Sequence, residues 1–409
     1  MSRVAWMRLG GALLVALAVA AGAFALVRDG AGSEPGSSET TASTGPPSSG
    51  SRAASTTTSG PAAAESPGPL LVWTAGGLPA AAPEQIAALP GVERVTVVRG
   101  DLVDLVASTD AAGAPVDAAP PGMRIPLDAL AIDPATYPAF VPGGGSDADA
   151  LARLQPGEAV LGATSARLRR LGPGGVLALA NGATVTVTAV VADEAVGAAE
   201  LVVATAGAPA IGVSVPRFLL VAYSGDRAGL EAGIAALLPG QPVRFRAEGE
   251  TPYLRHADLV LPQAVVKERF GEFAYRDGAD RFLEVDPAYE AAHIAAAPVP
   301  ILGQVTCHRD ALPAIEGALR ELEQAGLAGL VDPAGYQGCY VASIIPGSGG
   351  VSRHSWGIAI DVNFLPNPTE LASFADPRLE AVMERWGFVP GSRFLTTDPG
   401  HFEYVGSPQ

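Results

Sequence analysis

Two short segments near the end of the sequence combine histidine with carboxylate side chains in a way that suits a metal ion. The first, residues 352–361, places His354 shortly before Asp361, at the start of a predicted strand. The second, residues 398–404, brings His401 just after a Pro-Gly turn. Two histidines and one aspartate are typical of a catalytic zinc site, where three protein ligands leave a fourth position for water.

Carboxylates beside these ligands could supply a base. Zinc lowers the pKa of such a water to about 7, and a nearby carboxylate can accept its proton during attack on a carbonyl. Asp398, just before His401, is the predicted base. Glu403 could be that base instead, or it could orient a ligand histidine through the second ring nitrogen.

Strands must position these side chains. Because successive residues of a strand face opposite sides, Asp361 shares its face with Gly357 and Ala359, and these small side chains leave room for an ion and a substrate. On a terminal strand, His401 and Glu403 share a face by the same rule. A histidine with a purely structural role remains the alternative for either segment taken alone.

Two helices are predicted to support these strands. The first begins with Asp310 as its N-cap and stops at Gly326, and the second begins at Asp376 and stops at Gly387. Apolar residues at helical spacing predict the core faces, which are Leu312, Ile315, Leu319 and Leu322 in the first helix and Leu379, Val382, Met383 and Trp386 in the second.

The two segments together resemble a known family. The pattern Ser352-x-His354-x-x-Gly357-x-Ala359-x-Asp361 with Asp398-x-x-His401-x-Glu403 is similar to the zinc D-Ala-D-Ala carboxypeptidase and L-alanyl-D-glutamate endopeptidase family, cell-wall peptidases related in fold to the zinc domain of hedgehog. The likeness extends upstream through residues 270–273, 300–303, 307–308 and 338–340, so it covers about residues 257–406.

This resemblance implies an α+β domain with a small antiparallel sheet that cleaves peptidoglycan stem peptides. It implies Zn²⁺ as cofactor, held by His354, Asp361 and His401, with Asp398 as catalytic base. The remaining motif residues are expected to support the ligands or to contact substrate; they are Glu403, Arg353, Ser352 and Trp356.

One position departs from the family pattern. Relatives commonly carry an arginine after the segment that matches residues 338–340, whereas this chain has Val341. The missing guanidinium removes a bidentate partner for a free carboxy terminus. Cleavage within a peptide, or use of Arg353 as a substitute, is therefore expected.

The chain has two cysteines, Cys307 and Cys339, both in the domain that is expected to be exported. A disulfide between them is the favoured interpretation. Two free thiols are the alternative, and a zinc site built from cysteine is disfavoured because the chain has no Cys-x-x-Cys spacing.

The N-terminus predicts export. Arg3 and Arg8 precede an uncharged apolar run from Leu9 to Val27, which as a helix would span about 30 Å and match a bilayer core. Residues 1–30 are therefore expected to form a membrane anchor that holds the protein at the bacterial cell membrane as a single-pass protein with extracytoplasmic domains. A cleaved signal peptide, which would make the protein secreted, is the alternative.

Two further regions precede the peptidase-like domain. Residues 31–69 consist almost wholly of Ser, Thr, Gly, Pro and Ala, and predict a disordered linker. Residues 70–248 alternate strand-like runs with short amphipathic helices, which predicts an α+β middle domain. Asn181-Gly182 predicts a hairpin with a type I′ turn, and residues 226–238 predict a helix with Leu230, Ile234 and Leu237 on one face.

Part of the middle domain has a resemblance of its own. The stretches 157–162 and 168–174 are similar to extracytoplasmic domains of ABC-type permeases that work on lipoproteins or cell division. The resemblance implies a binding or regulatory module with an envelope protein as partner, and a spacer domain without a ligand is the alternative.

Length and charge fit this organisation. At 409 residues the chain is long enough for two domains plus connecting segments. Its net charge of −16 repels polyanions, so no nucleic-acid partner is expected. The sequence therefore predicts a membrane-tethered zinc peptidase of D,D-carboxypeptidase or L,D-endopeptidase type. The alternative is a catalytically degenerate zinc-binding protein with a binding or regulatory role in the cell envelope.

Overall fold

The computed structural model describes residues 68–258, 260–345, 349–363 and 376–406. The predicted anchor or signal peptide at residues 1–30 lies outside these ranges, as does the predicted linker at residues 31–69 except for its last two residues. Within the described ranges, no helix has the length and hydrophobicity that crossing a bilayer would require.

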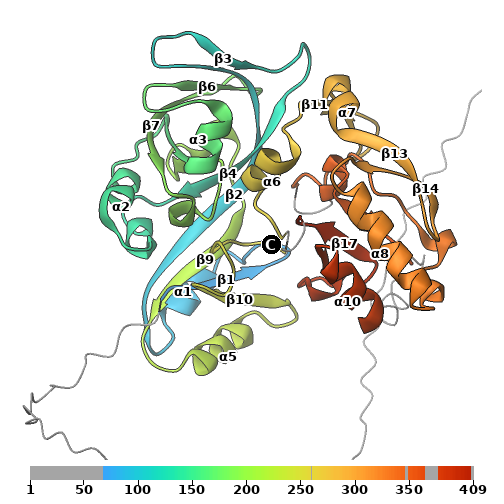
Figure 1. The fold of residues 1–409 in the computed structure, drawn as a ribbon. Helices are drawn as coiled ribbons and strands as arrows, with labels where there is room; N and C mark the ends of the chain where they lie inside the picture. Colours follow the sequence, from blue (N-terminus) through green and yellow to red (C-terminus); the bar gives the residue numbers. More distant parts are fainter. Residues whose placement is uncertain (1–67, 259, 346–348, 364–375, 407–409) are drawn as a thin grey trace, which may run out of the picture. The chain divides into compact units, whose positions relative to one another are not determined.

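The first half of the described chain builds a ten-stranded mixed sheet (Figure 1). Its main path runs β10-β1-β9-β2-β4-β8-β5-β7-β6, and β3 pairs with β2. The pairs β4–β8 and β5–β7 are parallel, and the other neighbours are antiparallel. The strands are β1 Leu70–Thr74, β2 Val92–Thr109, β3 Pro115–Ala118, β4 Ile125–Ile132, β5 Glu158–Gly162, β6 Val176–Leu179, β7 Thr184–Val191, β8 Leu201–Ala204, β9 Pro216–Tyr223 and β10 Val243–Ala247.

Short helices accompany this sheet. They are α1 Ala82–Ala87, α2 Gly145–Ala152, α3 Ala163–Arg169, α4 Ala208–Ile211 and α5 Arg227–Leu237, with 3-10 turns η1 Tyr137–Phe140 and η2 Asp193–Val196. Asp226 caps α5 by accepting hydrogen bonds from the backbone N–H groups of the first turn. Of the three residues predicted for its apolar face, Leu230 and Ile234 are buried, whereas Leu237 is half-buried.

The predicted hairpin forms between β6 and β7, but its turn is not type I′. A type I′ turn needs positive φ at both central residues. Here Gly182 has a φ of +86° and Asn181 does not. The Gly182 N–H donates to Leu179 O, and the Leu179 N–H donates to Ala183 O. The hairpin therefore has a three-residue loop that ends in a left-handed glycine.

The second half of the described chain contains three small antiparallel sheets, ordered β11-β12, β13-β14 and β15-β17-β16. Its elements are α6 Gln263–Phe270, β11 Tyr275–Asp277, β12 Leu283–Val285, α7 Pro287–His293, β13 Ile294–Val299, β14 Gly303–His308, α8 Leu312–Gln324, η3 Ala328–Leu330, η4 Pro333–Gly335, η5 Arg353–Trp356, β15 Ala359–Asp361, α10 Pro377–Arg385, β16 Phe388–Pro390, η6 Gly391–Arg393 and β17 His401–Tyr404. The α+β class predicted for the chain is confirmed.

The two predicted supporting helices form, but one end of each differs from the prediction. Helix α8 begins at Leu312 and its N-cap residue is Ala311, which caps through no side chain, so Asp310 is not the cap. Asp376 does cap α10, by accepting from the Arg378 N–H. Trp386 does not point into the core. It is 36% exposed, and its indole N–H donates to Glu321 on α8.

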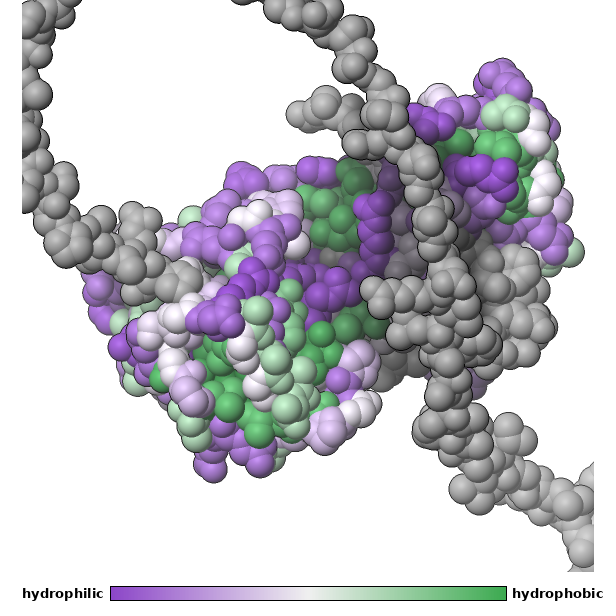
Figure 2. Space-filling model, turned by 90° about the horizontal axis from the view of Figure 1, so that it is seen from below, coloured by the Kyte–Doolittle hydropathy of each residue, from purple (hydrophilic) through white to green (hydrophobic). Residues whose placement is uncertain are grey.

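The hydrophobic core divides close to the predicted domain boundary. One cluster gathers residues between Val266 and Tyr404, and three clusters gather around the large sheet. All described residues nevertheless belong to one compact unit. Figure 2 shows one face of it, on which hydrophilic and hydrophobic side chains are interspersed.

A buried ionic network joins the two halves. Lys267 on α6 lies 2.7 Å from the Glu200 carboxylate and 2.9 Å from that of Glu272, and Arg169 on α3 also pairs with Glu272. Lys267, Glu200 and Arg169 are each at most 1% exposed. Because buried charges are tolerated only when they are paired, this network fixes α6 against the large sheet.

Candidate metal centre

The three-stranded sheet places two of the predicted ligands side by side. β17 lies between β15 and β16, and its antiparallel register with β15 sets Asp361 directly opposite His401. Directly opposite residues of neighbouring strands point to the same face with Cβ atoms about 5 Å apart. The alternation predicted for the two strands therefore brings this carboxylate and this imidazole together.

The third predicted ligand comes from a turn. His354 lies in η5, which begins after Ser352, whose hydroxyl accepts from the His354 N–H, and ends at Gly357 with a φ of +67°. The His354 Nδ1 lies 3.0 Å from the Cys339 carbonyl oxygen. Since a carbonyl only accepts, Nδ1 carries the proton and Nε2 is left as the metal-binding nitrogen.

The three ligand atoms fit a tetrahedral ion. His354 Nε2 lies 3.3 Å from His401 Nδ1 and 3.2 Å from Asp361 Oδ1, and the last two atoms are 2.8 Å apart. Zinc bound at 2.0–2.1 Å in a tetrahedron would hold its ligand atoms about 3.3 Å from one another. These residues therefore form a group that could hold a metal ion with a modest opening of the Asp361–His401 contact.

The neighbouring charges set the protonation states of Asp361 and His401. Burial alone would raise the pKa of Asp361, but hydrogen bonds with His354 and His401 outweigh it and hold that pKa below its ordinary range. Burial alone would lower the pKa of His401, whereas Asp361 and Glu403 raise it to about 10. The metal-free site thus holds a charged carboxylate and an imidazolium proton that a metal ion must displace.

Glu403 lies behind His401. Its Oε1 is 3.6 Å from His401 Nε2, the ring nitrogen that faces away from the other ligands, and its Oε2 accepts from the Val260 N–H at 3.0 Å. Burial opposes its ionisation, but His401 and Arg353 lower the pKa of Glu403 overall. Glu403 Oε1 makes no hydrogen bond among the described residues, so charge attraction to the His401 ring is what favours the predicted orienting role.

Asp398 lies at the exposed side of the site. The His401 N–H donates to the Asp398 carbonyl at 3.1 Å, and the Asp398 N–H donates to Gly391 O at 2.9 Å. Although the side chain is exposed, partial desolvation of its carboxyl raises the pKa of Asp398, and the Asp361 charge adds to this rise. A raised pKa suits a carboxylate that must hold a proton briefly.

The other predicted motif residues lie as follows. Trp356 is fully buried and donates its indole N–H to Gly271 O. Of its two predicted roles, support of the ligands and contact with substrate, this burial favours support. Ser352 caps η5. The Arg353 guanidinium donates to Leu261 O and lines a separate cavity, whose lining includes none of the three candidate ligands. These contacts give no support to Arg353 as a substrate clamp.

The predicted disulfide between Cys307 and Cys339 is present. It fixes the segment whose carbonyl orients His354, and Gly338 next to it forms a β-bridge with Asp361. The Val341 N–H donates to His354 O at 3.0 Å, so the position without an arginine does lie next to a ligand residue.

Sequence reasoning missed several backbone contributions to the site. The Cys339 carbonyl and the Val260 N–H fix His354 and Glu403, and a backbone group carries no signature in the sequence. Nothing in the sequence distinguishes Gly391 from the other glycines of the chain. A Cβ there would lie 2.5 Å from the Asp398 carbonyl oxygen and 3.0 Å from the His401 Cβ, so only glycine lets these segments meet.

Comparison with solved structures gives low overall similarity. The periplasmic region of MacB from Actinobacillus actinomycetemcomitans is 13% identical, covers 44% of this chain and 88% of its own, and has a TM-score of 0.30. The extracellular domain of the ABC-type transporter YknZ from Gram-positive bacteria is 10% identical, covers 42% and 92%, and has a TM-score of 0.28. At these TM-scores the role of residues 70–248 stays a prediction.

No curated protein matches the chain. The sequence model of a family described as D-alanyl-D-alanine carboxypeptidase matches residues 346–404. This segment contains the three candidate ligands together with Asp398 and Glu403. The match confirms the family resemblance that the motifs predict for the C-terminal segment.

Proposed function

We propose that the segment matched by the D-alanyl-D-alanine carboxypeptidase family is the catalytic part of a zinc peptidase that hydrolyses an amide bond in peptidoglycan stem peptides. The observation that carries this proposal is the convergence of His354 Nε2, His401 Nδ1 and Asp361 Oδ1 at tetrahedral spacing within that segment. Three protein ligands are the number that leaves a position open for reaction.

In this proposal the chain's own residues position the ligands and move the proton. Bound zinc supplies Lewis-acid chemistry, lowering the pKa of a water and polarising a carbonyl. Asp398 accepts the proton of the attacking water and returns it to the leaving nitrogen. Glu403 and the Cys339 carbonyl hold the rings of His401 and His354 in orientation.

The choice of scissile bond follows from position 341. A guanidinium there would bind the carboxylate of a terminal D-alanine, whereas Val341 offers no charge. Of the two reaction types, D,D-carboxypeptidase and L,D-endopeptidase, the missing cation favours cleavage within the peptide.

The disulfide supports a location outside the cytoplasm, because such bonds persist in oxidising compartments. We place the protein at the bacterial cell membrane, tethered through residues 1–30, with its stem-peptide substrate in the wall. An envelope protein is the proposed partner of residues 70–248, and nucleic acid is not.

One observation favours a second candidate function. Arg353, the cation nearest to the ligands in sequence, is bound to Leu261 O in another cavity, and Val341 is neutral. A domain that holds zinc without a clamp for substrate could serve as a binding or regulatory protein of the envelope.

A digestion experiment separates the two. Purified full-length protein with zinc is incubated with sacculi, and released peptides are identified by mass spectrometry. The peptidase should release fragments at one defined bond, and Asp398→Ala should slow release by about 10² to 10⁴ fold while zinc content stays unchanged. Asp310→Ala, which removes an exposed carboxylate of the same region, is the matched control.

Two results would overturn the proposal. Equal rates for the parent and Asp398→Ala would exclude Asp398 as the base. A parent that binds one zinc ion and leaves both sacculi and D-Ala-D-Ala peptides intact would favour the binding protein.

A further inference from the structure

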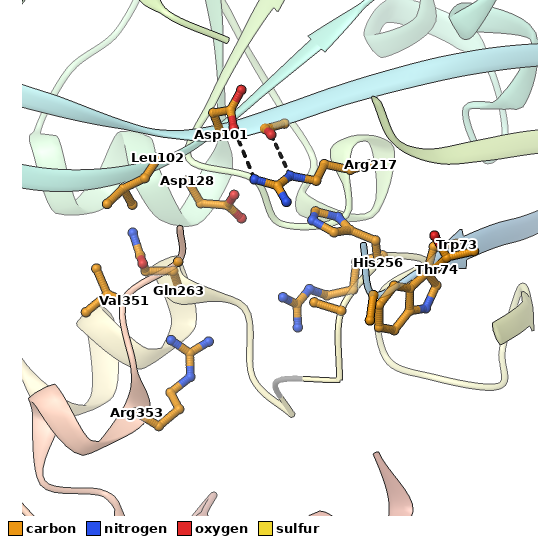
Figure 3. Close-up of a pocket in the computed structure, with 15 residues that line it drawn as sticks. Trp73, Thr74, Asp101, Leu102, Asp128, Arg217, His256, Gln263, Val351 and Arg353 are labelled. Atoms are coloured by element: carbon orange, nitrogen blue, oxygen red, sulfur yellow. Dashed lines mark hydrogen bonds and ion pairs between the residues drawn. The ribbon is translucent and has the colours of Figure 1, made fainter. Parts of the chain in front are cut away.

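A second cavity lies apart from the three candidate ligands. Its volume is about 100 Å³, and none of His354, Asp361 and His401 lines it. Figure 3 shows Asp128 and Arg217, from β4 and β9 of the large sheet, on one side of it and Arg353, from the C-terminal half, on the other.

Arg353 is the most unusual group in this cavity. It is 2% exposed, and its Nη2 donates to Leu261 O at 2.5 Å. Its Nε and Nη1 are buried and have no hydrogen-bond partner among the described residues. Figure 3 shows the guanidinium extending toward the cavity. A guanidinium has five N–H donors, and leaving buried donors unmet costs free energy, so the cavity needs an acceptor.

Further charged groups line the cavity beside Arg353. Arg217 and Arg255 line it with Arg353, against two carboxylates, Asp101 and Asp128. Asp101 is engaged by Arg217 at 3.0 Å and by backbone N–H groups of residues 214 and 215. The lining thus holds three arginines and two carboxylates, and Glu403, outside the lining, also acts on Arg353 and Arg255.

His256 adds no negative charge and no further cation. Its ring stacks on Phe218 with centroids 5.2 Å apart. Burial lowers the pKa of His256 to about 3, and the charges of Arg255, Arg217 and Arg246 act in the same direction. It stays neutral at physiological pH and can offer one ring N–H to a ligand.

We propose that this cavity binds a small anion that carries a carboxylate or phosphate group, with Arg353 as its main partner. Such oxyanions supply acceptors for the unmet donors of a guanidinium. The volume exceeds what one water needs, so a group of the size of acetate or phosphate fits. Ala75 in the lining is exposed, so the cavity borders on solvent there.

Calorimetric titration of the full chain tests this site. Sodium acetate and sodium phosphate are titrated separately at constant ionic strength, which also distinguishes a carboxylate from a phosphate as the source. At least one should bind with one-to-one saturation. Arg353→Gln should weaken binding at least tenfold, whereas Arg378→Gln, which removes an exposed arginine paired with Asp376, should leave it unchanged.

Asp128→Asn keeps the proposal testable if Arg353→Gln fails to fold, as judged by circular dichroism. Removing this negative charge should tighten anion binding, and unchanged or weaker binding would contradict the proposal. Absence of saturable binding of both anions to the parent would overturn it as well.

The metal centre must be separated from this cavity, since anions also bind zinc. The titration is therefore repeated after zinc has been removed with a chelator. Binding should persist in the metal-free protein. Binding that disappears with the metal would assign the anion to the metal centre and overturn the proposal, whatever the protein's activity on peptidoglycan.

Discussion

At the scale of single residues, His401 is held between two carboxylates. Asp361 accepts at 2.8 Å from one ring nitrogen and Glu403 lies 3.6 Å from the other. Burial opposes a charged ring, but the two acids outweigh it and raise the pKa of His401 to about 10. The metal-free fold therefore gains stability from this proton below about pH 6.5, and loses the gain as the pH rises through about 10.

The proton on His401 can be observed directly. In metal-free protein labelled with ¹⁵N at its histidines, one of the five rings should remain imidazolium at pH 8 and titrate near pH 10. Zinc should abolish that signal, because the metal takes the place of the proton. The signal should be missing in His401→Asn and present in His293→Gln. Titration of all five rings below pH 8 would contradict this arrangement.

The sequence indicates the candidate ligands by residue type, but it does not predict how their side chains are oriented. Asp361 and His401 can be placed on one face because strand side chains alternate with a fixed period. The tautomer of His354 depends on the carbonyl of Cys339, which reaches the site through a fold that no local pattern encodes. The role of Trp356 was ambiguous for the same reason, since burial is decided by distant partners such as Gly271.

At the scale of elements, the turn after His354 depends on a glycine. Gly357 has a φ of +67°, and a Cβ there would lie 2.6 Å from the His308 backbone nitrogen. Both the backbone conformation and the close approach to the β14 end therefore exclude other residues. This glycine lets the ligand turn lie against the disulfide-bonded segment.

A pair of glycine substitutions separates these two effects. Gly357→Ala should lower the free energy of unfolding by about 3 kcal/mol or more, because strain and a backbone clash add. Gly326→Ala, at a φ of +71° with no atom within 4 Å of the added Cβ, should cost only about 1 to 2 kcal/mol. Urea unfolding measures both. Equal losses would mean that the clash relaxes without cost.

Element boundaries show where local signals compete. Asp310 was a reasonable N-cap for α8, yet its N–H bonds to His308 Nδ1 and the helix begins after Ala311. The Asn181-Gly182 pair predicted a hairpin correctly, but the turn spans one residue more than the type I′ form. In both cases residue preferences predict the element, and competing local hydrogen bonds set its end.

At the scale of the whole molecule, the buried Lys267 network joins the α6 segment to the large sheet. Lys267→Met should lower the free energy of unfolding by about 3 to 5 kcal/mol, because the buried Glu200 carboxylate would lose its nearest cation. Arg167→Gln breaks the exposed ion pair between Arg167 on α3 and Glu268 on α6, and it should change stability little. Thermal unfolding of both variants checks this. Similar losses would mean that burial is unimportant here.

Neither the buried Lys267 network nor the anion cavity can be predicted from the sequence, and the physical reason is the same for both. Glu200, Lys267 and Arg353 look like ordinary surface charges in the sequence, because their burial depends on contacts between segments far apart in the chain. His256 likewise had no recognisable motif around it, although it stacks on Phe218 beside three arginines. The α+β character of the chain, by contrast, is predicted from local patterns of strands and helices.

The central place of β17 has a consequence for the timing of maturation. β15 and β16 pair with β17 and not with each other, and β17 also carries His401. The other two candidate ligands are therefore synthesised well before the strand that joins them. A chain interrupted before His401 would present two unpaired strand edges and an incomplete set of candidate ligands, so a ribosome that still holds this strand also keeps the centre from assembling.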